Sequence, residues 1–118
     1  MKMFITTLLS LVLSHLTPGG YELKGSQIKF YFLSADAELT VHVSGNFNQW
    51  SSEDEWKMSY NTSEKLYTLS KPIGSIKSAE RSFYEFTFRV NGKLIDANHE
   101  ASNVIHCAGY GSRYVIHF

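Results

Sequence analysis

The sequence predicts an all-β chain that folds as a small antiparallel β-sandwich of immunoglobulin-like type. Runs of alternating apolar and polar residues recur after residue 20, and turn-forming residues separate these runs. No segment beyond residue 20 has a convincing helical period, and aromatic residues, which favour strands, make up 14% of the chain. Strands with one apolar face must pair as two sheets to bury those faces. The Cys…Trp…Cys pattern of true immunoglobulin domains is absent from the sequence.

Each predicted strand has one apolar and one polar face. In chain order, the predicted strands cover residues 28–32, 39–43, 67–69, 84–90, 94–96 and 114–118. The pair Asn91-Gly92 stands between two of them and is the strongest short-range signal for a hairpin. The long polar stretch 51–64 predicts a loop. His42 falls on the polar face of its strand, where we expect a solvated imidazole.

Length, charge and cysteine content exclude several classes of protein. The 118 residues predict one domain with a core of its own. Eleven basic and eleven acidic residues give a formal net charge of zero, which argues against nucleic acid as a partner because binding to phosphates depends on excess positive charge. The single cysteine, Cys107, cannot form an internal disulfide, and no second Cys/His pair stands at metal-ligand spacing. We therefore expect a small, half-buried thiol, no metal and no cofactor.

Residues 1–20 predict a secretory signal peptide, which leaves the sandwich domain in residues 21–118. A single basic residue, Lys2, precedes the apolar run Met3–Leu13, and small residues follow near Gly19. The run is shorter than the roughly 20 residues that a membrane span needs, so we expect no membrane span once the signal is removed. The alternative is an N-terminal helix packed on the domain, because three hydroxyl residues spaced by four give a weak polar stripe.

The sequon Asn61-Thr62-Ser63 lies in a polar stretch and predicts glycosylation at Asn61. With the predicted signal peptide, it indicates a protein that is secreted or resides in the lumen of the secretory pathway. A cytoplasmic protein is the alternative.

Motifs for catalysis are missing from the sequence. It contains no Gly-x-Ser-x-Gly, no phosphate-cradling glycine loop and no His-Glu-x-x-His. The pair His99-Glu100 in a loop is the best catalytic candidate, but one such pair does not specify a site. The acidic run Glu53–Glu55 predicts a solvated turn rather than two carboxylates at a fixed separation. We therefore expect a protein that is not an enzyme.

The stretch Val43–Trp50, with the sequence VSGNFNQW, ends a strand on a tryptophan after a polar turn. A sugar presents an apolar C–H face and a rim of hydroxyl groups, so an exposed aromatic ring with amide side chains beside it suits sugar binding. Trp50 with Asn46, Asn48 and Gln49 forms such a group. The alternative is that Trp50 folds back over the loop that follows it, and Trp56 is expected to pack beneath the same loop.

Three segments resemble a known family. The segment VHVSGNFNQWSS resembles the Gly-Ser/Thr-Phe-Asn-x-Trp signature of the glycogen-binding domain of AMP-activated kinase β-subunits, which also occurs beside starch-branching and debranching enzymes. FTFRVNGKLID and GYGSRYVIHF resemble two later segments of the family, and the likeness runs from about residue 28 to residue 118. The resemblance implies an early-set β-sandwich that binds α-glucan chains, such as glycogen or starch, without catalysis.

The resemblance also implies roles for single residues. Trp50 matches the first sugar-stacking tryptophan, and Gly45, Phe47 and Asn48 match the turn that presents it, with Phe47 expected in the core.

Three other sugar contacts of the family are changed in this chain. The family's lysine falls on Thr87, its second tryptophan on Leu94, and its asparagine before the last strand on Arg113 or Tyr114. Arg89, on the same strand face as Thr87, is a candidate donor to hydroxyl groups. Tyr110 and Tyr114 are candidates for a second ring.

The sequence therefore predicts a non-catalytic module with weak α-glucan binding centred on Trp50. A single aromatic platform is worth on the order of 1–3 kcal/mol, by analogy with base stacking, so affinity should be millimolar at best. The alternative is a protein–protein interaction module that has lost sugar binding, with Phe83 and Tyr31 as its exposed aromatic residues.

Overall fold

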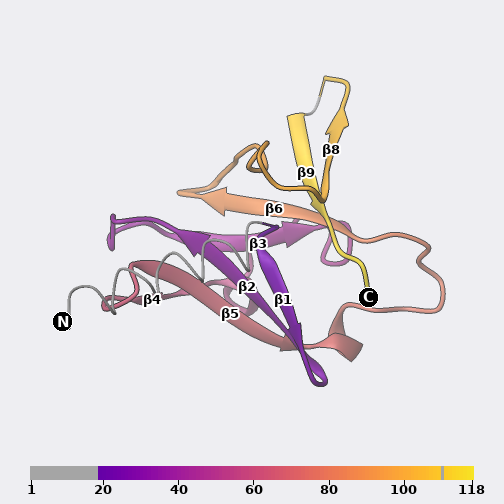
Figure 1. Ribbon diagram of the computed structural model, residues 1–118, viewed down its shortest axis with the longest axis horizontal. Coiled ribbons are helices and arrows are strands. Elements are labelled where there is room, and N and C mark those ends of the chain that lie inside the picture. The colour runs from indigo at the N-terminus through magenta and orange to yellow at the C-terminus, as the bar shows by residue number, and fades with distance from the viewer. Residues whose placement is uncertain (1–18, 110) are drawn as a thin grey trace.

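The computed structural model describes residues 19–109 and 111–118. Their strands form two antiparallel sheets (Figure 1). The first sheet has the order β1-β2-β5-β4, with β1 Tyr21–Lys24, β2 Gln27–Leu33, β5 Leu66–Pro72 and β4 Ser59–Asn61. The second has the order β3-β6-β9-β8, with β3 Val41–Gly45, β6 Glu85–Val90, β9 Gly111–Val115 and β8 Val104–Cys107; β7 Lys93–Leu94 pairs with β6. Two short 3₁₀ helices, η1 Asp54–Trp56 and η2 Ile73–Ser75, lie in connections. The predicted antiparallel β-sandwich is confirmed.

The observed strands differ from the predicted ones in number and in bounds; β3 ends two residues later than predicted and β5 three residues later. β1, β4 and β8 were not predicted, and they are edge strands of three or four residues. The last strand begins at Gly111 rather than 114, because it pairs first with β8 and then with β6. The Asn91-Gly92 hairpin is present, with φ values of 50° and 84°, as its turn type requires. Its return strand, β7, has only two residues, because the chain then leaves β6 for β9.

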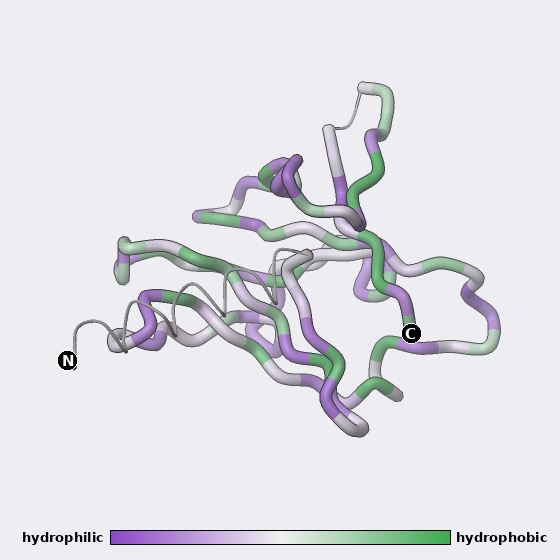
Figure 2. Tube along the Cα trace, in the orientation of Figure 1, coloured by the Kyte–Doolittle hydropathy of each residue, from purple (hydrophilic) through white to green (hydrophobic). Residues whose placement is uncertain are grey.

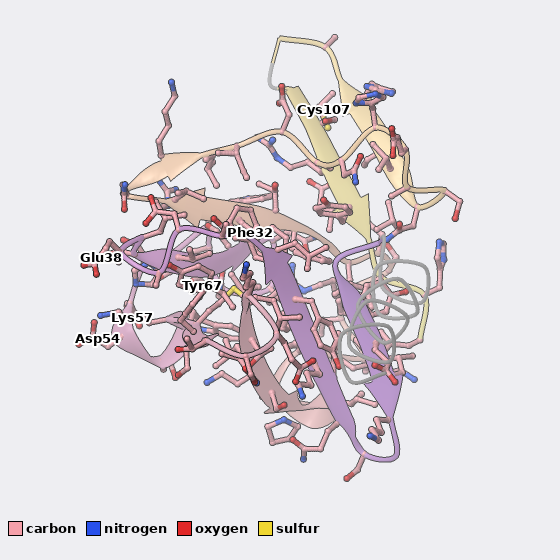
Figure 3. All side chains as sticks on the ribbon, turned by 60° about the vertical axis from the view of Figure 1, so that its left-hand side comes forward. Phe32, Glu38, Asp54, Lys57, Tyr67 and Cys107 are labelled. Carbon is pink, nitrogen blue, oxygen red and sulfur yellow. The ribbon has the colours of Figure 1, made fainter. Side chains whose placement is uncertain are left out.

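Aromatic rings fill the space between the sheets, and hydrophobic and hydrophilic residues alternate along the strands (Figure 2). Phe86 lies at the centre of this core. It meets Phe30 of the opposite sheet edge-to-face at 5.0 Å between ring centroids and stacks on Tyr114 at 5.1 Å. Both packing modes are favourable for aromatic pairs, and burial of each such side chain is worth roughly 1.5–3 kcal/mol. In Figure 3, Phe32 and Tyr67 mark the same core where β2 and β5 run side by side.

The segment that follows β3 protects the free edge of that strand. The Trp50 N–H donates to the Gly45 carbonyl oxygen at 2.9 Å, and the Met58 N–H donates to that of Val41 at 2.8 Å. Between them, His42 forms an isolated bridge with Lys57. All five residues of β3 are buried, and His42 is only 7% exposed. The prediction of a solvated His42 was wrong, because alternation within a strand does not reveal a cover supplied by another segment.

β6 and β9 pair at only two positions and then diverge, so that the β8–β9 hairpin rises away from the stacked sheets (Figure 1). The segment after β7 fills the opening. The Thr87 hydroxyl donates to the Ile95 carbonyl oxygen at 2.7 Å, and the Ala97 N–H donates to that of Ser112 at 3.2 Å. These bonds satisfy polar backbone groups that the diverging strands leave unpaired.

Within residues 19–109 and 111–118, no helix is both long enough and apolar enough to span a bilayer. The predicted signal peptide or N-terminal helix, residues 1–20, lies outside the described residues apart from Gly19 and Gly20.

Candidate functional site

The turn that carries Trp50 is built around the buried side chain of Asn48. Its Oδ1 accepts from the Gly45 N–H at 2.9 Å and from the Ser51 N–H at 3.4 Å, and its Nδ2 donates to the Val43 carbonyl oxygen at 3.0 Å. Asn48 is 8% exposed. The amide therefore shapes the turn, and the prediction of Asn48 as a binding residue receives no support from this position.

Asn46 also serves the backbone. Its Nδ2 donates to the Phe83 carbonyl oxygen at 3.1 Å, and its Oδ1 accepts from the Glu85 N–H at 3.0 Å. The side chain thereby fixes the turn to the start of β6, and the prediction of Asn46 as a ligand contact receives no support from this position.

Gln49 and Trp50 both lie in the left-handed region, with φ values of 54° and 56°. Non-glycine residues rarely adopt this conformation, which costs of order 1–3 kcal/mol and is concentrated at ligand-binding sites. At Trp50 it is held by two bonds, the N–H bond to Gly45 and a bond from Arg89 to the Trp50 carbonyl oxygen. The backbone thus fixes where the indole stands.

Arg89 joins this turn to the β6–β7 hairpin. Its Nη2 donates to the Trp50 carbonyl oxygen at 3.0 Å, and its Nη1 donates to that of Gly92 at 3.0 Å. Two N–H groups of the guanidinium are thus engaged with the backbone, and the predicted role of Arg89 as a donor to sugar hydroxyl groups stays a prediction. Arg89 thereby links Trp50 to the β6–β7 hairpin through two hydrogen bonds, and we call this link the brace. In the hairpin, Arg89 pairs with Leu94.

The indole of Trp50 is half-buried and lines a recess of about 330 Å³ on the outer face of the second sheet. The other lining residues are Glu85, Leu94, Cys107 and Arg113, and we call this site the Trp50 recess. Trp50 comes from the β3–β4 connection, Glu85 and Leu94 come from β6 and β7, and Cys107 and Arg113 come from the diverging β8–β9 hairpin. Figure 3 shows Cys107 on this hairpin.

Arg113 supplies the cationic side of the Trp50 recess. Its guanidinium carbon stands 5.2 Å from the centroid of the Trp50 ring, within the range of a cation–π contact. Among the described residues, Arg113 donates one hydrogen bond, from Nη1 to the Ser112 carbonyl oxygen at 3.0 Å, so other N–H groups of its fork remain for a ligand. The carboxylate of Glu85 adds an acceptor, while Leu94 and Cys107 add apolar surface.

Two other predicted contacts, Thr87 and Tyr114, are absent from the lining of the recess. Thr87 is fully buried and bonded to Ile95, and Tyr114 is 6% exposed in the core. The Tyr114 hydroxyl accepts from the Asn98 N–H at 2.8 Å, and burial raises the pKa of Tyr114. Both residues are thus buried and bonded within the fold, and their predicted binding roles receive no support from these positions; Tyr110 lies outside the described residues.

The aromatic residues near the recess have different surroundings. Trp56 is 6% exposed, with the Phe47 ring 5.5 Å away and the Lys71 ammonium 4.7 Å from its centroid. The expectation that Trp56 packs beneath its loop is therefore confirmed, and Phe47 packs against the core as expected. Trp50 neither folds into that loop nor stands free, since Arg113 lies against it.

Sequence reasoning did not identify Glu85 and Cys107 as recess residues. Glu85 could have been found, because it lies two and four residues before Thr87 and Arg89 on one strand face. Cys107 could not, because its position depends on the register of β8 with β9, in which it pairs with Gly111. As expected, Cys107 is a half-buried free thiol.

A second recess, of about 450 Å³, lies on the other side of the β8–β9 hairpin, and His99, His106, Cys107 and Asp96 are among its lining residues. Within the described part of the chain, no three His, Cys, Asp or Glu side chains are grouped so that they could hold a metal ion. His99 and Glu100 are both exposed.

The sequon begins at Asn61, the last residue of β4, and continues into a tight turn. The Asn61 Oδ1 accepts from the Ser63 hydroxyl at 2.8 Å and from the Glu64 N–H at 3.1 Å.

No protein-family model and no curated protein sequence matches the chain. The likeness to glycogen-binding domains therefore depends on the three sequence segments quoted above.

Proposed function

We propose that the chain is a non-catalytic module that binds α-glucan chains weakly at the Trp50 recess. The observation that carries the proposal is the meeting of a half-exposed indole, held at positive φ, with a guanidinium and a carboxylate around one recess. An aromatic face packs on the C–H face of a glucose unit. Arg113 donates to hydroxyl groups and Glu85 accepts from them.

The positions that differ from the glycogen-binding family also favour this site. Leu94 matches the family's second tryptophan, and Arg113 is one of the two residues, with Tyr114, that match its asparagine; Leu94 and Arg113 line one recess with Trp50. Leu94 retains apolar contact without a second aromatic platform, and Arg113 retains hydrogen-bond donors. One platform worth about 1–3 kcal/mol, added to a few hydrogen bonds of about 1 kcal/mol each, gives millimolar affinity after association costs.

Affinity electrophoresis in native gels that contain glycogen or amylopectin tests the proposal. We expect the polysaccharide to retard the wild type and to retard Trp50→Ala much less. Phe83→Ala is the matched control, because Phe83 is an exposed aromatic residue outside the recess, at 57% exposure. Absence of retardation for the wild type, or equal retardation for Trp50→Ala, would contradict the proposal.

Exposure of Phe83 favours a second candidate, a protein-interaction module. Phe118 is also exposed, at 38%. Tyr31, the other residue predicted for such a surface, is only 9% exposed, and its hydroxyl donates to the Glu22 carboxylate at 3.0 Å. A stoichiometric partner that Phe83→Ser loses and Trp50→Ala retains would support this candidate, and failure to recover any stoichiometric partner would count against it.

A further inference from the structure

We infer that His42 is an acid-sensitive positioning residue for the Trp50 recess, so that its protonation loosens the brace between Arg89 and Trp50 and releases the ligand. The ligand part of this inference rests on the proposed function, whereas the movement of Trp50 does not. The inference follows from unpaired polar atoms, from the charges around His42, and from the hydrogen bonds of Arg89.

Three of the buried polar atoms without a hydrogen-bond partner in the described residues lie together on β3 and β6. They are the Nδ1 of His42, the Oγ of Ser44 and the Nε of Arg89. His42 and Arg89 are direct partners in the strand pairing, so their side chains leave the same face of the sheet. In a neutral imidazole one ring nitrogen can accept a hydrogen bond, and the buried Nε–H of Arg89 on the same face is a donor. A protonated imidazole has two donors and no acceptor. The arrangement therefore suits neutral His42.

The charges around His42 oppose its protonation. Lys57 stands opposite it across the isolated bridge, and Arg89 stands opposite it across the β3–β6 pairing. Asp54 of η1 is the acidic group near it, and Figure 3 shows Asp54 and Lys57 at the same end of the sandwich. Burial is the main cause that lowers the pKa of His42, Lys57 and Arg89 lower it further, and Asp54 acts in the opposite direction. A proton on His42 thus adds a third positive charge beside two others that one carboxylate only partly offsets.

Arg89 carries the effect to the recess. Of its five N–H donors, one on Nη2 holds the Trp50 carbonyl oxygen and one on Nη1 holds that of Gly92. Repulsion from a protonated His42 pushes the guanidinium away from β3, and these two bonds are the contacts that must lengthen. Trp50 is in a strained left-handed conformation, so it relaxes once its carbonyl is released.

The direction of the pH dependence follows from the lowered pKa. His42 is neutral above its usual value of about 6.5, where its contribution to stability is complete. That contribution is lost as the pH falls below this value, because the unfolded chain then binds a proton that the folded chain resists. Ligand affinity should fall at lower pH, as the pH passes through the lowered pKa of folded His42.

Nuclear magnetic resonance of the full chain tests the inference. The indole N–H signal of Trp50, assigned by its absence from Trp50→Phe, is followed from about pH 7.5 to about pH 5 together with the ring signals of His42. We expect both to shift with one common apparent pKa below the usual histidine value. In His42→Gln the Trp50 shift should disappear, whereas in the control His117→Gln, which replaces an exposed histidine, it should remain. A Trp50 signal that does not move with His42, or that moves equally in His42→Gln, would overturn the inference.

Binding of maltoheptaose measured at both ends of this pH range separates the inference from the proposed function. We expect the dissociation constant to rise at least about fivefold at the lower pH in the wild type and to stay nearly constant in His42→Gln. A pH dependence of binding that persists in His42→Gln would overturn the inference. If no binding occurs at any pH while the Trp50 signal still follows His42, the proposed function fails and the acid-sensitive brace stands.

Discussion

Replacement of Asn48 by alanine tests whether one buried amide holds the turn that presents Trp50. The change removes the acceptor for the Gly45 N–H and the donor to the Val43 carbonyl oxygen, and both of these backbone groups are buried. A buried polar group left without its partner costs about 1–3 kcal/mol. Two such groups, partly relieved by water that enters the vacated space, predict a loss of about 2–4 kcal/mol in the free energy of unfolding.

Urea unfolding followed by tryptophan fluorescence measures this loss as a lower midpoint with an unchanged slope. Gln49→Ala is the matched control, since Gln49 is the next residue, is exposed and has the same left-handed backbone conformation. We expect the control to change stability by less than about 0.5 kcal/mol. If Asn48→Ala were as stable as the control, Asn48 would not be the structural centre of the turn, and its prediction as a ligand contact would return.

Three further predictions concern the surroundings of the site and the surface. Gly45→Ala places a Cβ 2.5 Å from the Glu85 carbonyl oxygen and should cost about 1–3 kcal/mol in urea unfolding, whereas Gly74→Ala, whose Cβ meets no atom within 4 Å, should not. Burial and the nearby Glu22 carboxylate raise the pKa of Tyr31 to about 12, so its contribution to stability is complete below about pH 10 and is lost as the pH rises through 12. Ultraviolet titration should show one late tyrosinate that Tyr31→Phe lacks; an unchanged curve would refute this assignment. Expression in a eukaryotic secretory pathway should give a glycosidase-sensitive form that Asn61→Gln lacks, and identical mobility of both proteins would refute the predicted modification.

The fold was largely predictable because period-two alternation records the two faces of each long strand. β2 and β6 carry that pattern over six or seven residues and were found near their true limits, whereas β5 was predicted only over residues 67–69 and extends to Pro72. β1 alternates over only four residues, and β4 has three, so neither stands out from a loop by pattern alone.

The site was predictable only where it depends on local sequence. Trp50 at the end of a polar turn could be identified, but the return of the chain along β3, which buries His42, is a tertiary contact without a local signal. The different surroundings of Arg89 and Arg113 are of the same kind. Arg89 was a candidate from its strand position, whereas Arg113 was named only as a position where a contact of the family is changed. The divergence of β9 from β6 accompanies the contact of Arg113 with the indole, while Arg89 binds backbone.

The most direct test of a glucan site at the Trp50 recess is a titration of the wild type with maltoheptaose, followed by two-dimensional NMR of backbone, indole and methyl signals. We predict saturable shifts at millimolar ligand that include the indole N–H of Trp50, the methyl groups of Leu94 and the amide of Arg113, while the indole N–H of the buried Trp56 stays in place. Absence of shifts at these concentrations, or shifts elsewhere on the sandwich with Trp50 unmoved, would contradict the account.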